Sequence, residues 1–110
     1  MARPLSINEA LDRLDELADT DICVRGILCF AFENRCLVHL PYAERRGGYS
    51  SSIWIEVGAG ALQFDRRVCE SLGGKRVIVE GTLIRPDPIF GGGHMGLWPA
   101  EIVARTLRRE

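Results

Sequence analysis

Apolar residues near the N-terminus recur with the spacing of a helix. Between residues 6 and 19 they return at intervals of three and four, and acidic side chains occupy the other face. Ser6 and Glu9 have the spacing of a capping box, which starts a helix at Ser6. The pattern predicts a helix over about residues 6–19, with its apolar stripe packed on the rest of the protein and its acidic face solvated.

From Asp21 onward the period of the apolar pattern changes to two, which predicts strands. The first strand covers about residues 21–32, and a short turn follows at 33–35. The second strand covers 36–40, with Cys36, Val38 and Leu40 facing inward and Leu37 and His39 facing outward. Residues 41–52 have the Gly, Ser and charged composition of a loop. The third strand covers 53–57. It is expected to direct inward Ile53, Ile55 and Val57, and outward Trp54 and Glu56.

The second half of the chain alternates between breaks and regular segments. Glycines at 58 and 60 end the third strand, and residues 61–72 are expected to form a short helix that ends at the Gly73-Gly74 pair. A fourth strand is predicted over 76–85, a long glycine-rich loop over 86–99, and a fifth strand over 100–107. The predicted order is therefore one helix followed by β-β-β-α-β-β.

Two of these strands contain the same pattern, V-x-G-x-L, at residues 24–28 and 79–83. A glycine inside a long strand permits a sharp coil or bulge, so that one strand serves both halves of a small barrel. This combination resembles the OB-fold over residues 21–107, and its segments G-K-R-V-I-V-E-G-T-L and G-H-M-G-L-W-P-A-E-I-V are similar to small uncharacterised bacterial OB-fold proteins. The expected architecture is mainly β: a five-stranded OB-like β-barrel at 21–110 with an added N-terminal α-helix at 1–20, one domain overall.

Composition limits the partners that charge alone would attract. The 110 residues carry 14 basic and 15 acidic groups, a formal net charge of −1. Six acidic groups but one arginine lie in residues 7–21, whereas twelve basic and nine acidic groups lie in 22–110. A net charge of −1 excludes a protein that coats nucleic acid by charge alone. A local basic patch within residues 22–110 stays possible.

The cysteines and the N-terminal sequence bear on the cellular compartment in which we expect the protein. Cys23, Cys29, Cys36 and Cys69 form no C-x-x-C pair, which argues against a zinc knuckle or a thioredoxin motif. The sequence has no signal-peptide-like apolar run at its start and no stretch long enough to span a membrane. We expect a soluble, cytoplasmic protein with reduced thiols and no membrane association.

The OB-fold resemblance implies where a ligand would bind: across the second and third strands, between the first-second and fourth-fifth loops. If Leu40 pairs with Ile53, His39 lies opposite Trp54, and a turn at 33–35 places Cys29 opposite His39. An outward row of Cys29, His39 and Trp54 would offer an aromatic plane for stacking bases. The candidate ligand-binding residues on this face and its bordering loops are His39, Trp54, Tyr42, Arg45, Arg46, Tyr49, Arg85, Phe90, His94 and Trp98.

Each candidate also has a purely structural interpretation. Trp54 packs beneath the 41–52 loop or the N-terminal helix, with His39 filling space beside it. The glycine loop folds onto the barrel rim, and His94 hydrogen-bonds the loop to itself or to a strand end. Neither a P-loop nor a dinucleotide fingerprint is satisfied at residues 91–96.

Catalytic and metal-binding chemistry lacks support in the sequence. No nucleophile elbow, H-E-x-x-H motif or diagnostic carboxylate pair is present. Cys29 and His39 have no third ligand beside them, so no metal and no cofactor is predicted. We therefore expect a non-enzymatic binding module. Its leading ligand is single-stranded DNA or RNA. The alternative is a protein-protein interaction module (an accessory, inhibitor or immunity-type subunit) that uses the acidic helix or the apolar outer face.

Overall fold

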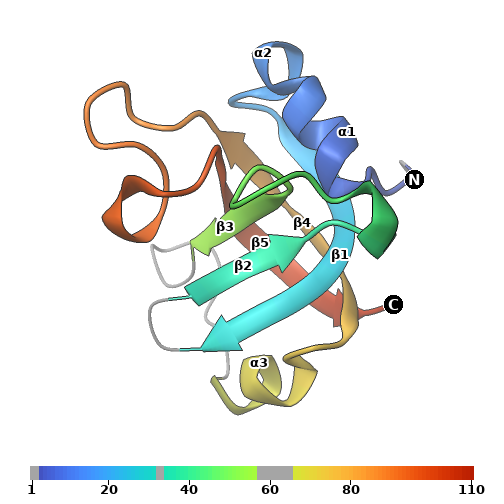
Figure 1. The fold of residues 1–110 in the computed structure, drawn as a ribbon. Helices are drawn as coiled ribbons and strands as arrows, with labels where there is room; N and C mark the ends of the chain where they lie inside the picture. The colour runs from blue at the N-terminus through green and yellow to red at the C-terminus, as the bar shows by residue number, and fades with distance from the viewer. Residues whose placement is uncertain (1–2, 32–33, 57–65) are drawn as a thin grey trace.

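The computed structural model describes residues 3–31, 34–56 and 66–110. Figure 1 shows the strands and helices of this part of the chain. The helices are α1 (Ile7–Asp12), α2 (Leu14–Leu17) and α3 (Arg66–Leu72), with short 3-10 turns η1 (Tyr42–Glu44) and η2 (His94–Gly96). The strands are β1 (Asp21–Ala31), β2 (Asn34–Val38), β3 (Ser52–Glu56), β4 (Arg76–Ile84) and β5 (Glu101–Arg109).

The five strands close into a barrel in the order β1-β2-β3-β5-β4, and β1 and β4 pair to complete the ring. β3 and β5 run parallel, and the other neighbours are antiparallel. The predicted sequence of three strands, a helix and two strands is confirmed. Expectations for Phe32, Val57 and residues 61–65 lie outside the described residues.

The first strand takes part in both halves of the barrel, as its central glycine predicts. β1 pairs with β4 from Asp21 to Ile27 and with β2 from Ile27 to Ala31. The change of partner occurs at Ile27, next to Gly26, where a Cβ atom would lie 2.8 Å from the carbonyl oxygen of Val38. Only a residue without a side chain permits this close approach. The second V-x-G-x-L segment lies at an irregularity of the ladder, because between Glu80 and Gly81 the register of β4 skips Arg105 of β5.

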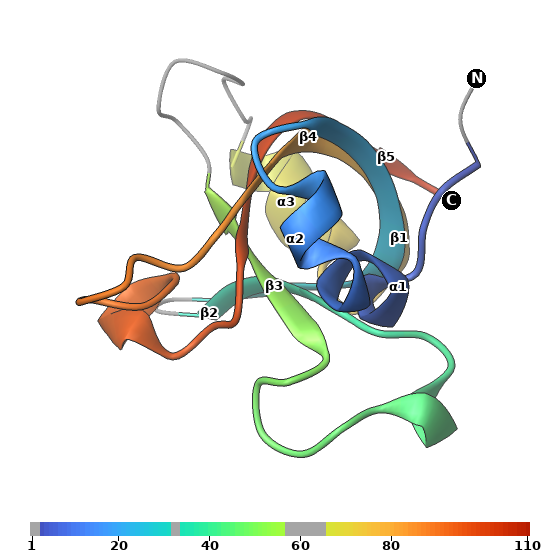
Figure 2. The ribbon, with the colours of Figure 1, turned by 90° about the horizontal axis from the view of Figure 1, so that it is seen from above.

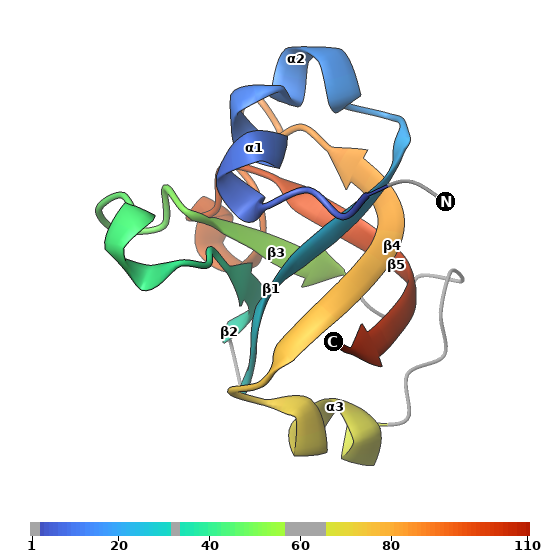
Figure 3. The ribbon, with the colours of Figure 1, turned by 90° about the vertical axis from the view of Figure 1, so that its right-hand side faces the viewer.

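The N-terminal helices lie over one end of the barrel, and α3 lies at the opposite end (Figures 2 and 3). The capping box is confirmed: Ser6 Oγ accepts the backbone N–H of Glu9 at 3.1 Å. A single helix over 6–19 is wrong, because Arg13 has non-helical dihedral angles and separates α1 from α2. Ile7 and Ala10 are fully buried in the barrel core, so α1 closes the end of the barrel with apolar side chains.

The inward and outward faces of β2 are the reverse of the prediction. Leu37 is buried in the barrel core, whereas Cys36 and Val38 belong to a separate cluster on the outer face. β1 and β2 pair until Ala31 lies opposite Asn34, so residues 34 and 35 belong to the strand rather than to a turn. A register shift by an odd number of residues exchanges the two faces of a strand. Ile53 and Ile55 of β3 lie in the core as predicted.

Candidate functional site

The outer face of β1, β2 and β3 is the region where the OB-fold resemblance places a ligand. The register sets Cys29 opposite Cys36 and Cys36 opposite Trp54. The row across the three strands is therefore Cys29, Cys36 and Trp54. The predicted row with His39 in its centre is wrong, because both pairings differ from the prediction by three residues.

Trp54 lies on the outer face but is buried, with 8% of its surface exposed. Trp98 packs edge-on against it, with ring centroids 4.8 Å apart, and the His94 ring lies 6.4 Å away. Trp54 Nε1 donates to Glu56 Oε2 at 3.1 Å. The interpretation of Trp54 as an exposed stacking platform is wrong, because the loop between β4 and β5 covers it.

This loop, residues 85–100, can approach the sheet closely because of one glycine. Gly93 has φ +66°, and a Cβ atom there would lie 2.8 Å from the Trp98 ring and 2.9 Å from the Trp54 ring. Gly93 N–H donates to Glu101 Oε1 at 2.6 Å, which ties the loop to the start of β5. The structural interpretation, in which the glycine loop folds onto the barrel rim, agrees with this geometry.

The outer part of the same loop has an ordered backbone. Asp87 and Gly91 form an isolated bridge, as do Gly92 and Trp98. The Asp87 carboxylate accepts the backbone N–H groups of Ile89 and Phe90 at 2.8 and 2.9 Å. These hydrogen bonds hold a group of exposed apolar side chains in place, which we call the apolar tip: Ile89, Phe90, Met95 and Leu97.

Of the apolar tip, only Phe90 is among the candidates from sequence. Ile89, Met95 and Leu97 are missed because the alternation rules that select core residues do not apply to loops. The signal that could have found them is the combination of large apolar residues with glycines in a segment without regular periodicity.

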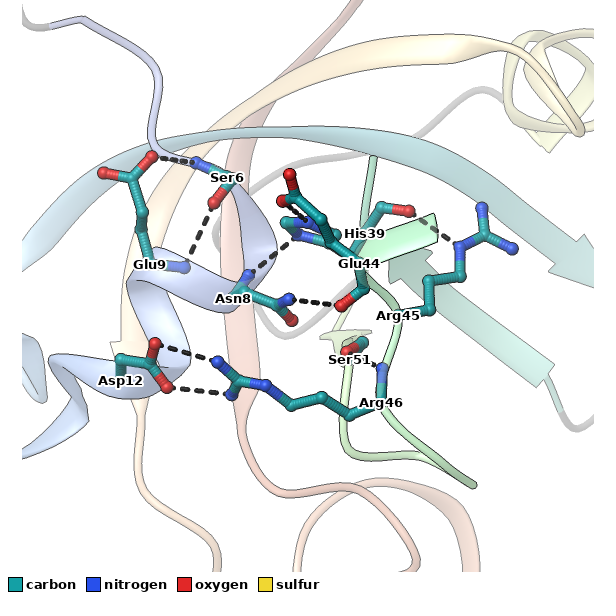
Figure 4. Close-up of polar contacts among 9 residues, drawn as sticks. All are labelled: Ser6, Asn8, Glu9, Asp12, His39, Glu44, Arg45, Arg46 and Ser51. Carbon is teal, nitrogen blue, oxygen red and sulfur yellow. Dashed lines mark hydrogen bonds and ion pairs between the residues drawn. The ribbon is translucent and has the colours of Figure 1, made fainter. Parts of the chain in front are cut away.

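His39 serves the fold rather than an exposed face (Figure 4). Only 1% of the residue is exposed. Its Nδ1 accepts the backbone N–H of Asn8 at 3.1 Å, and its Nε2 lies 3.0 Å from Glu44 Oε1. Since Nδ1 is the acceptor, Nε2 carries the hydrogen and donates to Glu44. His39 thus joins the first turn of α1 to the segment after β2, and its placement on an outward ligand row is wrong.

The arginines of the 41–51 segment are also held within the molecule. Arg45 Nε donates to the His39 carbonyl at 2.7 Å, and its guanidinium lies 4.7 Å from the centre of the Tyr42 ring. Arg46 makes a bidentate ion pair with Asp12 on α1, at 2.8 and 2.9 Å (Figure 4). The Arg46 guanidinium donates these hydrogen bonds and so lowers the pKa of the Asp12 carboxyl.

Arg85 follows the same pattern, because its guanidinium pairs with Asp15 of α2 at 2.7 Å. The acidic helical face is solvated as predicted, because Asp12 and Asp15 are exposed, but arginines from two different loops also contact it. The ten candidate residues do not converge on one site. Trp54, Tyr49, His94 and Trp98 gather under the glycine loop, where Tyr49 lies 4.7 Å from Trp98. Phe90 lies at the loop's outer end. His39, Arg46 and Arg85 bond to α1 or α2, whereas Arg45 and Tyr42 contact each other in the 41–51 segment.

A small hollow of about 160 Å³ lies on the outer face beside the buried tryptophan. Its walls include both cysteines of the outer row, Arg45 and Tyr49. Among residues 3–31, 34–56 and 66–110, no three His, Cys, Asp or Glu side chains gather as a metal site would require. Within the same residues, no helix combines the length and the apolarity needed to cross a membrane.

Comparison with known proteins establishes the fold. No protein-family model and no curated protein matches the chain. An OBody bound to hen egg-white lysozyme matches over 99% of this chain and 96% of its own, with a TM-score of 0.58 and 14% identity. A putative aspartyl-tRNA synthetase from Leishmania major Friedlin matches 93% of this chain with a TM-score of 0.51 and 18% identity; the match covers 19% of that protein.

Proposed function

We propose that this chain, which has an OB-fold, is a non-enzymatic module that binds a protein partner through the apolar tip. The OB-fold is the architecture of many binding modules. The observation that carries this proposal is that large apolar side chains stand in solvent on a backbone fixed by hydrogen bonds. Phe90 is 77% exposed, and Ile89 and Met95 are exposed to a similar degree.

The composition of the loop favours a protein over a nucleic acid. Residues 88–100 contain no Lys, Arg, Asp or Glu. The carboxylate of Asp87 is already bonded to the loop backbone. The centres of protein-protein interfaces are depleted in charge and enriched in aromatic residues and Met. Nucleic-acid affinity, by contrast, depends on Lys and Arg contacts to phosphates. The expected partner therefore presents an apolar, uncharged hollow.

Single-stranded nucleic acid is the second candidate, supported by the exposed rings of Phe90 and Tyr42. Tyr42 is 76% exposed and lies next to Arg45, an arrangement that suits base stacking beside a phosphate. Against it, Trp54 is buried, and Arg46 and Arg85 are paired with acidic groups of the helices. For these reasons we rank the nucleic-acid hypothesis second.

We extend the proposal to a cytoplasmic location, a compartment in which cysteine thiols such as the four of this chain stay reduced.

Phe90 and Tyr42 form a matched pair for the test, because both are aromatic and almost equally exposed. A photoreactive phenylalanine analogue placed at either position captures whatever protein contacts that site in cells, and mass spectrometry identifies it. The identified protein is then titrated against purified wild type, Phe90→Ala and Tyr42→Ala by calorimetry. We expect cross-linking at position 90 and a loss of affinity of at least about tenfold for Phe90→Ala, the size typical of a central interface residue. Tyr42→Ala should bind like wild type.

The same variants are titrated with labelled oligo(dT) and oligo(U) at 50 and 300 mM NaCl. Oligonucleotide binding that weakens steeply with salt and is lost in Tyr42→Ala would replace the protein hypothesis with the nucleic-acid one. A captured protein whose affinity is unchanged in Phe90→Ala would show that the apolar tip is not the interface.

A further inference from the structure

Two cysteines face each other on the outer side of the barrel. Cys29 of β1 and Cys36 of β2 are direct partners in the antiparallel ladder. Directly opposite residues have Cα atoms roughly 4.5–5.5 Å apart, and disulfides form at Cα separations of about 4.4–6.8 Å. The two sulfurs can therefore be joined without moving the strands.

The two thiols differ in access. Cys29 is partly exposed, whereas Cys36 is 4% exposed beneath its neighbours. Both line the hollow of about 160 Å³ on the outer face, which has room for the end of a small molecule. A reagent entering this hollow meets Cys29 first.

Cys29 and Cys36 also differ in the pKa of their thiols. The Cys36 thiol acts as a hydrogen-bond donor to Cys29 and lowers the pKa of Cys29, and the nearby Arg45 guanidinium adds to the effect. The same contact raises the pKa of Cys36, which keeps its proton; when this single S–H does not point to Cys29, it can donate to Asn34 Oδ1, 3.2 Å away. Since the thiolate is the attacking form, Cys29 is the nucleophile of the pair.

We propose that Cys29 and Cys36 are a redox modification site, at which Cys29 exchanges with a low-molecular-weight disulfide such as oxidised glutathione and Cys36 resolves the product into an intrachain disulfide. In the first step the Cys29 thiolate attacks one sulfur of the small disulfide, and one small thiolate leaves. In the second step Cys36 releases its proton to water and attacks Cys29 Sγ, and the second small thiolate leaves. Two protein thiols are oxidised and one small disulfide is reduced to two thiols.

The order of the steps follows from the charges. While Cys29 is a thiolate, its charge and its hydrogen bond hold the proton on Cys36. Once Cys29 is part of a mixed disulfide, that negative charge is gone and Cys36 ionises more readily. The first reaction therefore activates the second.

The other two cysteines are internal controls. Burial raises the pKa of Cys23, and Cys69 is buried on α3. Neither has a cross-strand cysteine partner in the described ladder. Both should react with a small disulfide only slowly while the protein stays folded.

The test incubates the folded, reduced protein with oxidised glutathione at pH 7, blocks remaining thiols, and maps products by mass spectrometry after tryptic digestion. Cleavage after Arg25, Arg35 and Arg45 separates the two cysteines, so the predicted product is a disulfide between peptides 26–35 and 36–45. We expect Cys36→Ser to stop at the mixed disulfide on Cys29. Cys29→Ser should give neither product, and Cys69→Ser should behave like wild type. Circular dichroism of each variant establishes that it is folded.

A second measurement examines Cys29 directly. Iodoacetamide should label Cys29 at least about tenfold faster than Cys23 at pH 7, and Cys36→Ala, which removes the hydrogen-bond donor, should move the pH midpoint of Cys29 labelling upward. The proposal is overturned if folded Cys29→Ser still forms a disulfide at Cys36, if all four thiols react at one rate, or if reaction requires urea.

Discussion

His39 has the chemistry of a ligand residue, but the fold uses it to cap a helix. The second N–H of α1, on Asn8, has no acceptor within its own short helix, and His39 Nδ1 supplies one. Ser6 Oγ accepts the next N–H, on Glu9. Two N–H groups at the start of α1 are thus satisfied, one by a local side chain and one by a side chain 31 residues away.

Replacing His39 should reduce stability. His39→Leu keeps an apolar side chain in the site but leaves the buried Asn8 N–H without its acceptor, which costs about 1–3 kcal/mol. Urea unfolding followed by circular dichroism measures the change. The control, Tyr42→Ala at an exposed position, should change the free energy of unfolding by less than about 0.5 kcal/mol. Equal stability of His39→Leu and wild type would mean that the contact to Asn8 does not support the helix.

At the scale of elements, the loop between β4 and β5 decides what the sheet presents to solvent. Without the loop, Trp54 and Cys36 would form an open aromatic and thiol surface on β2 and β3. With the loop in place, Trp54 is covered, and the side chains of the apolar tip are exposed to solvent instead. The exposed apolar surface therefore lies on the loop rather than on the sheet.

The close approach of this loop predicts an effect of one substitution. Gly93→Ala adds a Cβ against two indole rings at a positive φ, whereas Gly48→Ala adds one at a similar φ with no atom within 4 Å. Both place a side chain at a positive φ, but Gly93 also has ψ −164°, a region open essentially to glycine alone, so their difference combines packing with backbone strain. We expect Gly93→Ala to be less stable than Gly48→Ala by about 1–3 kcal/mol, the usual range for overpacking.

Tryptophan fluorescence provides a second measurement for Gly93→Ala and Gly48→Ala. The chain contains two tryptophans, Trp54 and Trp98, and both lie under the loop. Gly93→Ala should therefore shift the emission of the folded protein to longer wavelength, while Gly48→Ala should leave it unchanged. The same emission and stability in both variants would contradict the packing of the loop on Trp54.

At the scale of the whole molecule, ion pairs explain how an acidic N-terminal region and an arginine-bearing body coexist. Asp12 pairs with Arg46, Asp15 with Arg85, and Asp21 with Arg105. Each pair joins the N-terminal region or the start of β1 to a distant part of the chain. The near-zero net charge thus reflects mutual neutralisation inside one molecule, which leaves few arginines of these loops for phosphate.

These contacts predict a loss of stability in acid. Hydrogen bonds from Arg46 and Arg105 lower the pKa values of Asp12 and Asp21 below the ordinary 3.8, and the Ser6 backbone N–H lowers that of Glu9 below 4.5. A carboxyl with a lowered folded-state pKa stabilises the fold above its unfolded-state pKa, and that contribution is lost as the pH falls through the folded value.

The melting temperature should therefore be steady above about pH 5 and fall from there toward pH 2. Thermal unfolding by circular dichroism at several pH values measures it. Because these pairs lie at the surface, 1 M NaCl should flatten the acid dependence. A melting temperature that stays constant or rises between pH 5 and 2 would exclude these carboxylates as the cause of acid sensitivity.

Local patterns in the sequence were sufficient to predict the elements and their order. The capping box at Ser6, the alternation along β1 and β4, and the glycine that bends β1 all depend on neighbours within a few residues. The closed barrel follows from them, because few arrangements bury every apolar face of five such strands.

Sequence alone could not decide the register of β2 or the cover on Trp54. β2 carries apolar residues on both faces, Leu37 on one and Cys36 and Val38 on the other, so alternation cannot distinguish inside from outside. Trp54 is buried by a loop that begins some thirty residues later, and His39 is bonded to a helix that precedes it by thirty-one. Local sequence therefore determined the strands and their bends, while contacts between distant segments decided which side chains stand in solvent.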